Sequence, residues 1–245
     1  MRAQRGVALL LVLWTLATLS LLLGGLAGWV QLEQRQAVWQ RQHAQALLAA
    51  QAGVSLALQA LLDAQHRPRW IVDGRVVPLA FDDAQLAVSV SSERGKLDLN
   101  AASAEDLIRV AQACGADRDQ ALRLSRALQA RLANGATPLR VIEELRQLPG
   151  MTQTLYARMA PHVTLWSGLS RPDAAFASPL LRGALGLPSQ TNAAGHDADA
   201  DAGSVLSIDS RAQLPGGVVA RLQTTVLLSP SEGNAQPYRV LRWQE

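Results

Sequence analysis

Hydrophobic and polar positions divide the N-terminal part of the chain into two stretches. From Val7 to Val30 the residues are uncharged and mostly apolar. From there to Asp63 apolar residues recur at helical spacing among Gln and Arg. The pattern predicts one long helix over Val7–Asp63, apolar on all sides in residues 7–32 and amphipathic in residues 33–66.

Shorter segments with the period of half-buried strands follow the helix. The first group is Trp70–Val72, Val76–Phe81, Gln85–Ser92 and Lys96–Leu99. Asp73-Gly74 is a dipeptide suited to a tight hairpin turn. Strand character returns near the C-terminus in Val205–Ile208, Val218–Leu228 and Tyr238–Trp243. We expect residues 204–245 to complete the sheet that residues 67–102 begin.

Between the two groups of strands, residues 103–168 carry helical signals. Ser103 with Asp106 resembles a capping box, and Thr137-Pro138 places an N-cap before a helix over Leu139–Leu148. Thr152 caps a further helix through Met159. Residues 169–203 are expected to be a flexible connection. The fold class predicted is α+β: a helix packed on an antiparallel sheet, with an all-helical domain inserted between strands.

Charge and composition exclude several function classes. The formal net charge of the 245-residue chain is +3, and Arg2 and Arg5 carry two of those charges, so the remainder is nearly neutral. Cys114 is the only cysteine, which excludes an intrachain disulfide and a zinc site with two thiolates. The sequence has no G-x-S-x-G elbow and no phosphate-binding glycine loop. It therefore gives no basis for an enzyme.

Two readings remain for the N-terminal segment. As a helix, Val7–Val30 rises about 36 Å, enough to cross a bilayer core. Arg2 and Arg5 before it place the N-terminus in the cytoplasm and the bulk of the chain outside the inner membrane. A secretory signal peptide cleaved near Gly24–Gly28 is the alternative, but the apolar run continues into the amphipathic stretch without a break.

The residues Gln4-Arg5-Gly6-Val7-Ala8-Leu9-Leu10 resemble the processing site of type IV pilin-like proteins. The resemblance implies that prepilin peptidase cuts after Gly6 and that Val7 becomes a methylated N-terminus. Leu11 and Trp14 then lie in the membrane and assembly part of the helix. Most pilins and pseudopilins have a glutamate where this chain has Leu11. The minor pseudopilin K branch of type II secretion typically lacks it.

Further segments, in the same order along the chain, resemble the pseudopilin K family: Gly95–Ala102, Glu144–Thr152, Val163–Leu165 and Pro237–Trp243. The resemblance implies a pilin-like head in the periplasm on a single-pass inner-membrane helix. It also implies a place at the pseudopilus tip, where the protein would initiate assembly and support the export of folded proteins. The implied partners are the minor pseudopilins I and J, prepilin peptidase and the inner-membrane secretion platform.

One segment also suggests a different function. Leu148, Pro149, Gly150 and Thr152 resemble the hairpin of helix-hairpin-helix modules, which bind DNA phosphates through backbone amides. This would make the chain an exported DNA-binding protein of natural transformation. However, Ser103–Gly168 contains eight Arg against six Asp and Glu, a net charge of only +2. Phosphate binding needs a concentrated basic face, so a structural hairpin is the favoured interpretation.

Metal and cofactor sites are weakly indicated. Asp197, Asp199 and Asp201 have the spacing of the first ligands of a calcium loop, but Ile208 stands where the bidentate Glu is needed. An acidic solvated loop is favoured, and calcium remains open. The four histidines have no ligand spacing; they are His43, His66, His162 and His196. No other metal or cofactor is expected.

Overall fold

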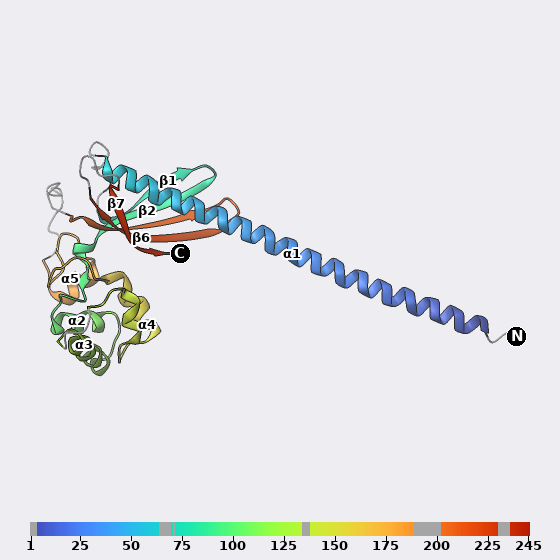
Figure 1. Cartoon of the computed structure of the whole chain (residues 1–245), viewed down its shortest axis with the longest axis horizontal. Coiled ribbons are helices and arrows are strands. Elements are labelled where there is room, and N and C mark those ends of the chain that lie inside the picture. The colour runs from blue at the N-terminus through green and yellow to red at the C-terminus, as the bar shows by residue number, and fades with distance from the viewer. Residues whose placement is uncertain (1–3, 64–69, 71, 134–137, 189–201, 230–235) are drawn as a thin grey trace.

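A long helix and an antiparallel sheet frame the molecule in the computed structural model, which describes residues 4–63, 70, 72–133, 138–188, 202–229 and 236–245. The helix α1 spans Gln4–Leu62. Its C-terminal half lies on the sheet, and its N-terminal half projects from the head as a rod (Figure 1). The predicted helix over Val7–Asp63 is therefore confirmed.

Five strands form the main sheet in the order β1-β2-β5-β6-β7, and every neighbouring pair is antiparallel. The strands are β1 (Asp73–Phe81), β2 (Ala84–Ser92), β5 (Val205–Gln213), β6 (Val219–Leu228) and β7 (Tyr238–Gln244). As predicted, the C-terminal strands complete the sheet that the first group begins. The fold is α+β.

Besides larger apolar side chains, the helix packs on the sheet through small residues. Ala46, Ala50, Gly53 and Ala57 form a buried stripe on α1 that faces β2, β5 and β6. A Cβ atom added to Gly53 would lie 2.3 Å from Ser210 Oγ. The stripe therefore brings the helix backbone closer to the strands than Leu or Val would allow.

The first hairpin turns at a different place from the one predicted. Asp73-Gly74 does not form the turn: both residues lie within β1, where the register with β2 shifts before Val76. The chain turns instead at Asp82 and Asp83, between β1 and β2. Asp82 has a positive φ of 51°, a conformation that Asp tolerates better than most residues. Trp70 and Val72 lie before β1 and are not in a strand.

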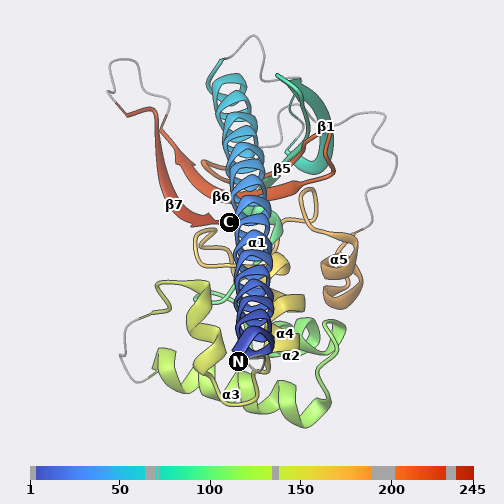
Figure 2. The same cartoon turned by 90° about the vertical axis from the view of Figure 1, so that its right-hand side faces the viewer.

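The predicted helical insert is present as a separate unit beside the sheet (Figure 2). It begins at β3 (Leu97–Asp98) and returns at β4 (Val163–Thr164), and these two strands pair in parallel as a small sheet of their own. Between them lie three α-helices: α2 (Ala104–Ala113), α3 (Arg118–Ala133) and α4 (Gln153–Met159). Ser103 and Thr152 cap α2 and α4 as predicted. Short 3-10 helices occupy Glu93–Gly95, Ile142–Gln147 and Ala160–His162.

The helix predicted over Leu139–Leu148 is a 3-10 helix over Ile142–Gln147. The side chain of Asn100 explains the late start, because it accepts from the Leu139 amide and donates to the Leu139 carbonyl. Both backbone groups of Leu139 are therefore used outside the helix, and Glu144 accepts from the amide of Val141 to begin the 3-10 helix there.

Part of the expected flexible connection, residues 169–203, is structured. The helix α5 spans Pro179–Leu185 and buries Leu181 and Leu185 in the core of the insert. Its signals are present in the sequence: Ser178 is an N-cap before Pro179, and Gly186 ends the helix with a left-handed conformation. The helical unit is therefore larger than residues 103–168.

Candidate assembly surface

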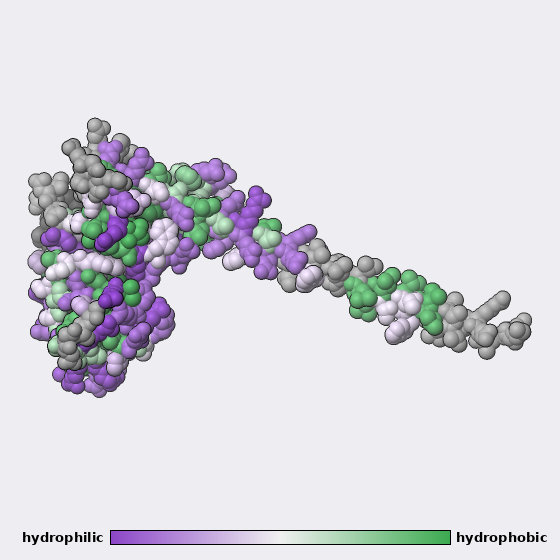
Figure 3. Space-filling model, in the orientation of Figure 1, coloured by the Kyte–Doolittle hydropathy of each residue, from purple (hydrophilic) through white to green (hydrophobic). Residues whose placement is uncertain are grey.

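The projecting end of α1 carries a dense run of exposed large apolar side chains between Leu11 and Leu22. Leu11 is 62% exposed and Trp14 is 70% exposed. The hydroxyls of Thr15 and Thr18 donate to carbonyls of the preceding turn, so this stretch presents few free polar groups. Figure 3 shows the rod hydrophobic at this end and hydrophilic nearer the head. A helix apolar on its outside needs lipid or other apolar helices around it.

Two stretches of α1 are apolar enough to be considered as membrane segments. By length and composition, Glu33–Leu62 could cross a bilayer, and Leu11–Leu22 is a shorter apolar stretch; the test covers only the described residues. Much of Glu33–Leu62 is buried against the sheet, which already accounts for its apolar face. Leu11–Leu22 is exposed, and none of the described residues covers it in this way. These features are consistent with a membrane-anchored protein.

The predicted processing site lies at the start of α1. Gly6 and Val7 are in its first two turns, and residues 1–3 lie outside the described residues. Cleavage after Gly6 and methylation of Val7 stay predictions.

The hairpin at Leu148–Thr152 packs inside the helical unit. Leu148 ends the 3-10 helix, and its carbonyl accepts from the Met151 amide; Thr152 Oγ1 accepts from the Leu155 amide at 3.2 Å and so begins α4. Pro149 is exposed. Leu148 is half-buried at the rim of the core, in which the neighbouring Leu145, Leu155 and Met159 are buried.

Gly150 is the residue that fixes this hairpin. It has a φ of +92°, and a Cβ atom here would lie 2.8 Å from the Gln120 carbonyl oxygen and 3.2 Å from the Leu124 nitrogen of α3. The glycine therefore allows the hairpin to pass close to the α3 backbone. The α3 backbone fills the space that a side chain at this position would need.

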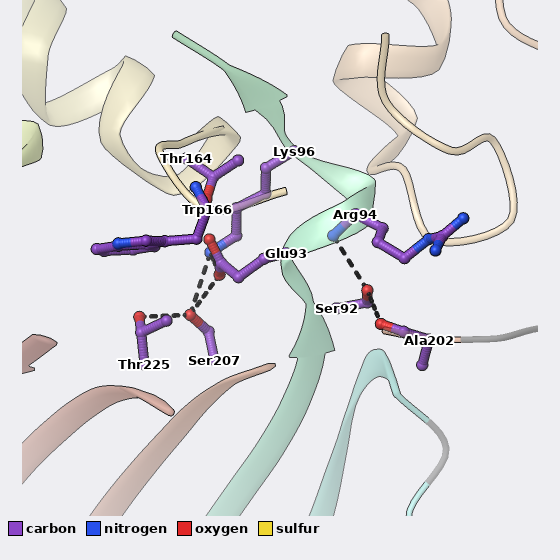
Figure 4. Close-up of polar contacts among 9 residues, drawn as sticks. All are labelled: Ser92, Glu93, Arg94, Lys96, Thr164, Trp166, Ala202, Ser207 and Thr225. Atoms are coloured by element: carbon purple, nitrogen blue, oxygen red, sulfur yellow. Dashed lines mark hydrogen bonds and ion pairs between the residues drawn. The ribbon is translucent and has the colours of Figure 1, made fainter. Parts of the chain in front are cut away.

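A buried polar cluster joins the sheet to the insert (Figure 4). Glu93 is buried, and its Oε1 atom lies 2.5 Å from Lys96 Nζ and accepts from Ser207 Oγ at 2.6 Å. Thr225 Oγ1 is 2.9 Å from Ser207 Oγ. Two residues just before the insert are thus bonded to Ser207 of β5, which in turn is bonded to Thr225 of β6. The sequence analysis missed this cluster because Glu93 and Ser207 are far apart in the chain.

The segment Gly95–Ala102, which carries part of the family resemblance, has structural roles here. A Cβ atom on Gly95 would lie 2.2 Å from the Phe176 carbonyl oxygen. The carboxylate of Asp98 accepts from the amides of Asn100 at 2.9 Å and Gly168 at 2.7 Å. Asp98 therefore joins the first residues of the insert to those that follow its last strand.

A second contact holds the insert against the outermost strand β7. Arg242 and Gln244 both donate to Glu143 Oε1, at 2.7 and 3.0 Å. Burial alone would raise the pKa of Glu143, but the hydrogen bond and charge of Arg242 hold that pKa below its usual value. The carboxylate is therefore charged at neutral pH and keeps its ion pair.

The histidines and the cysteine do not form a site in the described part of the chain. His43 is exposed and stacks on Trp39, and His162 Nδ1 lies 3.2 Å from Ser178 Oγ. Burial raises the pKa of the Cys114 thiol, which makes it unreactive. Within the described ranges, no three His, Cys, Asp or Glu residues are grouped to hold a metal ion. The calcium candidates Asp197, Asp199 and Asp201, together with His66 and His196, lie outside those ranges.

Comparison with known proteins supports the architecture. No protein-family model and no curated protein matches the sequence. Among solved structures, the chain is similar to one chain of the GspK-GspI-GspJ complex from the enterotoxigenic Escherichia coli type 2 secretion system. The TM-score is 0.55 with 16% identity, over 84% of this chain and 97% of that one. The protein therefore has a pseudopilin-like fold, shared with a chain of a type 2 secretion complex.

Proposed function

We propose that this chain is a minor pseudopilin of type II secretion, of the K kind, which works by binding and not by catalysis. The observation that carries the proposal is an exposed apolar rod attached to a head whose fold resembles a chain of the GspK-GspI-GspJ complex over 97% of that chain. The rod would lie in the inner membrane with its N-terminus in the cytoplasm and its head in the periplasm.

The proposed partners follow from the same likeness. The neighbouring structure is a complex of three proteins, GspK, GspI and GspJ, so we expect minor pseudopilins of the I and J kinds to bind this chain. Prepilin peptidase would remove residues 1–6 and methylate Val7, and the inner-membrane platform would draw the subunit into a pseudopilus. No cofactor is needed for this role.

Leu11 supports a place at the tip. In pilin-like fibres, we take the glutamate at this position to neutralise the N-terminal amine of the adjacent subunit. An unpaired acidic residue at a membrane helix centre costs about 2.5–3.5 kcal/mol on insertion scales. A terminal subunit lacks one neighbour and gains nothing from that carboxylate. The helical insert beside the sheet would also crowd neighbours in a repeating shaft.

Purification and labelling test the proposal. The tagged full-length chain, extracted from membranes with detergent, should bring down pseudopilins of the I and J kinds, and a label on its head should appear about once per fibre, at one end. Regular labels along the shaft would overturn the tip position alone. Failure to recover either pseudopilin, together with salt-sensitive retention of DNA, would instead favour the DNA-binding alternative.

A further inference from the structure

A cavity of about 350 Å³ lies where the end of the sheet meets α5. Its wall is formed by four separate stretches of chain, within residues 73–74, 91–96, 161–162 and 175–182. They belong to β1, to the end of β2 with the residues that follow it, to the last 3-10 helix of the insert, and to α5 with the residues before it. Helix α5 is on the side of the insert nearest the sheet (Figure 1). The volume is within the range of small-molecule sites, which is roughly 300–1,000 Å³.

Part of the lining is apolar. Leu181 is buried and Phe176 is half-buried, and the exposed Pro161 and Pro179 lie at the same cavity. Gly95 lets the backbone at Phe176 come close, because a Cβ atom on Gly95 would lie 2.9 Å from the Cβ atom of Phe176. The aromatic wall is therefore set by a tight backbone contact, and this part of the cavity suits an apolar group of a ligand.

The charged part of the lining favours an anion. Arg182 is half-buried and makes no ion pair within the described residues. Asp73 is the one acidic residue among the described residues of the lining, and Arg75 forms an ion pair with it at 2.9 Å. The charge of Arg182 is therefore not neutralised by any neighbour that the structure describes.

Lys96 supplies a second donor to the cavity. Its ammonium has three N–H groups. One is used on Glu93 Oε1 at 2.5 Å and another on Ser207 Oγ at 3.3 Å (Figure 4). The third has no partner among the described residues, although the side chain is only 14% exposed. Because polar groups this far from solvent are usually hydrogen-bonded, an acceptor in the cavity would complete the set.

His162 is a fixed and uncharged part of the wall. Burial, and then the charge of Lys96, hold its pKa below the usual value, so the ring is neutral at pH 7. Ser178 Oγ accepts from the Leu181 amide at 3.3 Å, which leaves the hydroxyl hydrogen for His162 Nδ1 at 3.2 Å. His162 thus lies between the ammonium of Lys96 and α5, where its signal will respond to a ligand in the cavity.

We propose that this cavity binds a carboxylate that carries a short apolar group. The carboxylate lies at Arg182 and Lys96, and the apolar group lies against Phe176 and Leu181. A guanidinium can hold a carboxylate through two parallel N–H···O bonds, which suits Arg182 to this role. A free small carboxylate and the C-terminal residue of a polypeptide share this chemistry. The site goes beyond the proposed function, because assembly of subunits needs no such ligand.

NMR of the full-length chain in detergent, isotope-labelled at histidine, tests the cavity. The chain has four histidines, so each signal can be assigned with a His→Gln variant. N-acetyl-leucine should shift the His162 signal at pH 7 and leave that of His43 unchanged. The expected dissociation constant is about 1 mM, typical of a ligand with about 12 non-hydrogen atoms. N-acetyl-leucinamide, which has the same apolar group without the charge, is the matched control and should bind at least tenfold more weakly.

A substitution at Arg182 tests the charged part of the site. Arg182→Gln should weaken binding of N-acetyl-leucine at least tenfold, and Arg182→Lys should weaken it less. Arg118→Gln removes the same charge from an exposed position in α3, outside the cavity, and should leave binding as in the wild type. Thermal unfolding shows whether the Arg182 variants are folded, and we expect an unchanged Tm because the side chain has no partner among the described residues.

A peptide identifies the source of the carboxylate. Acetyl-Gly-Gly-Leu that binds more tightly than N-acetyl-leucine assigns the site to a polypeptide end, and equal or weaker binding assigns it to a small carboxylate. The proposal is wrong if neither ligand shifts the His162 signal well above the expected dissociation constant. It is also wrong if the amide binds as well as the acid, or if Arg182→Gln binds like the wild type. None of these outcomes bears on copurification with other pseudopilins, so the proposed function is tested separately.

Discussion

At the scale of single residues, glycines decide how closely elements approach. Gly53 permits α1 to lie on β2 and β5, and Gly150 permits the hairpin to pass α3. At either position a side chain would meet an atom closer than 3.0 Å. The sequence identifies the hairpin that contains Gly150, but not its approach to α3, and it does not identify the contact of Gly53 with the sheet, because both depend on contacts between distant segments.

Gly53→Ala should lower the free energy of unfolding by about 1–3 kcal/mol, the usual cost of overpacking. The added methyl would lie 2.3 Å from Ser210 Oγ and 3.0 Å from a methyl of Val88. Gly183→Ala is the matched control, because Gly183 lies in α5 with no atom within 4 Å of an added Cβ. It should raise stability by about 1 kcal/mol through helix propensity. Thermal unfolding in detergent measures both, and equal effects would contradict the close packing.

At the scale of elements, sequence signals such as helix caps and alternating apolar residues predict the helices and strands that depend on contacts between nearby residues. The caps Ser103 and Thr152 and the alternation in β2 and β6 were sufficient to find those elements. The start of the 3-10 helix at Ile142 was not predictable, because it depends on Asn100 bonding to Leu139 across the insert.

The contact between α1 and the sheet is also only partly predictable from the sequence. Of the apolar residues at helical spacing, Val54, Leu58 and Leu61 are buried against the sheet, whereas Val38 and Leu48 are exposed. Small residues carry a weak hydropathy signal, so the sequence does not predict the line of Ala and Gly that lies beside the buried apolar residues. The exposed Leu11 and Trp14, by contrast, agree with the predicted membrane segment.

We expect the free energy of unfolding to depend on pH through His162, which contacts Ser178, the N-cap residue of α5. Burial, and then the charge of Lys96, hold the pKa of His162 below its usual 6.5. The unfolded chain therefore takes up the proton more readily, and protonation favours unfolding. Neutral His162 makes its full contribution to the free energy of unfolding above about pH 6.5. This contribution is lost as the pH falls through the lower pKa of the histidine in the folded protein.

Denaturant unfolding of the full chain at a series of pH values measures this. The free energy of unfolding should fall between about pH 7 and pH 5, and His162→Gln should make the fall smaller. His43→Gln, at an exposed histidine, is the control and should leave the slope as in the wild type. An unchanged slope in the His162 variant would show that other groups cause the pH dependence.

At the scale of the whole molecule, the N-terminus decides whether the rod stays attached to the membrane. Cleavage after Gly6 keeps the whole apolar run, whereas cleavage near Gly24–Gly28 releases the head. We expect the mature chain to begin at Val7 and Gly6→Val to leave the leader in place. N-terminal sequencing checks both, and Gly24→Val is the control that should be processed normally. A mature N-terminus between Gly24 and Gly28 would assign the protein to ordinary secretion.

The parallel pair β3–β4 brings the two ends of the insert side by side. Leu97 lies opposite Val163 and Asp98 opposite Thr164, so the chain leaves and returns within about 4.8 Å, the spacing of neighbouring strands. Helices α2 to α4, and α5, which packs into the same core after β4, lie in one continuous stretch between β2 and β5. They can therefore be lengthened, shortened or exchanged together by changes in one stretch of coding sequence, while α1 and the five-stranded sheet keep their register. The head can acquire new surfaces in evolution without rebuilding the helix and sheet that carry it.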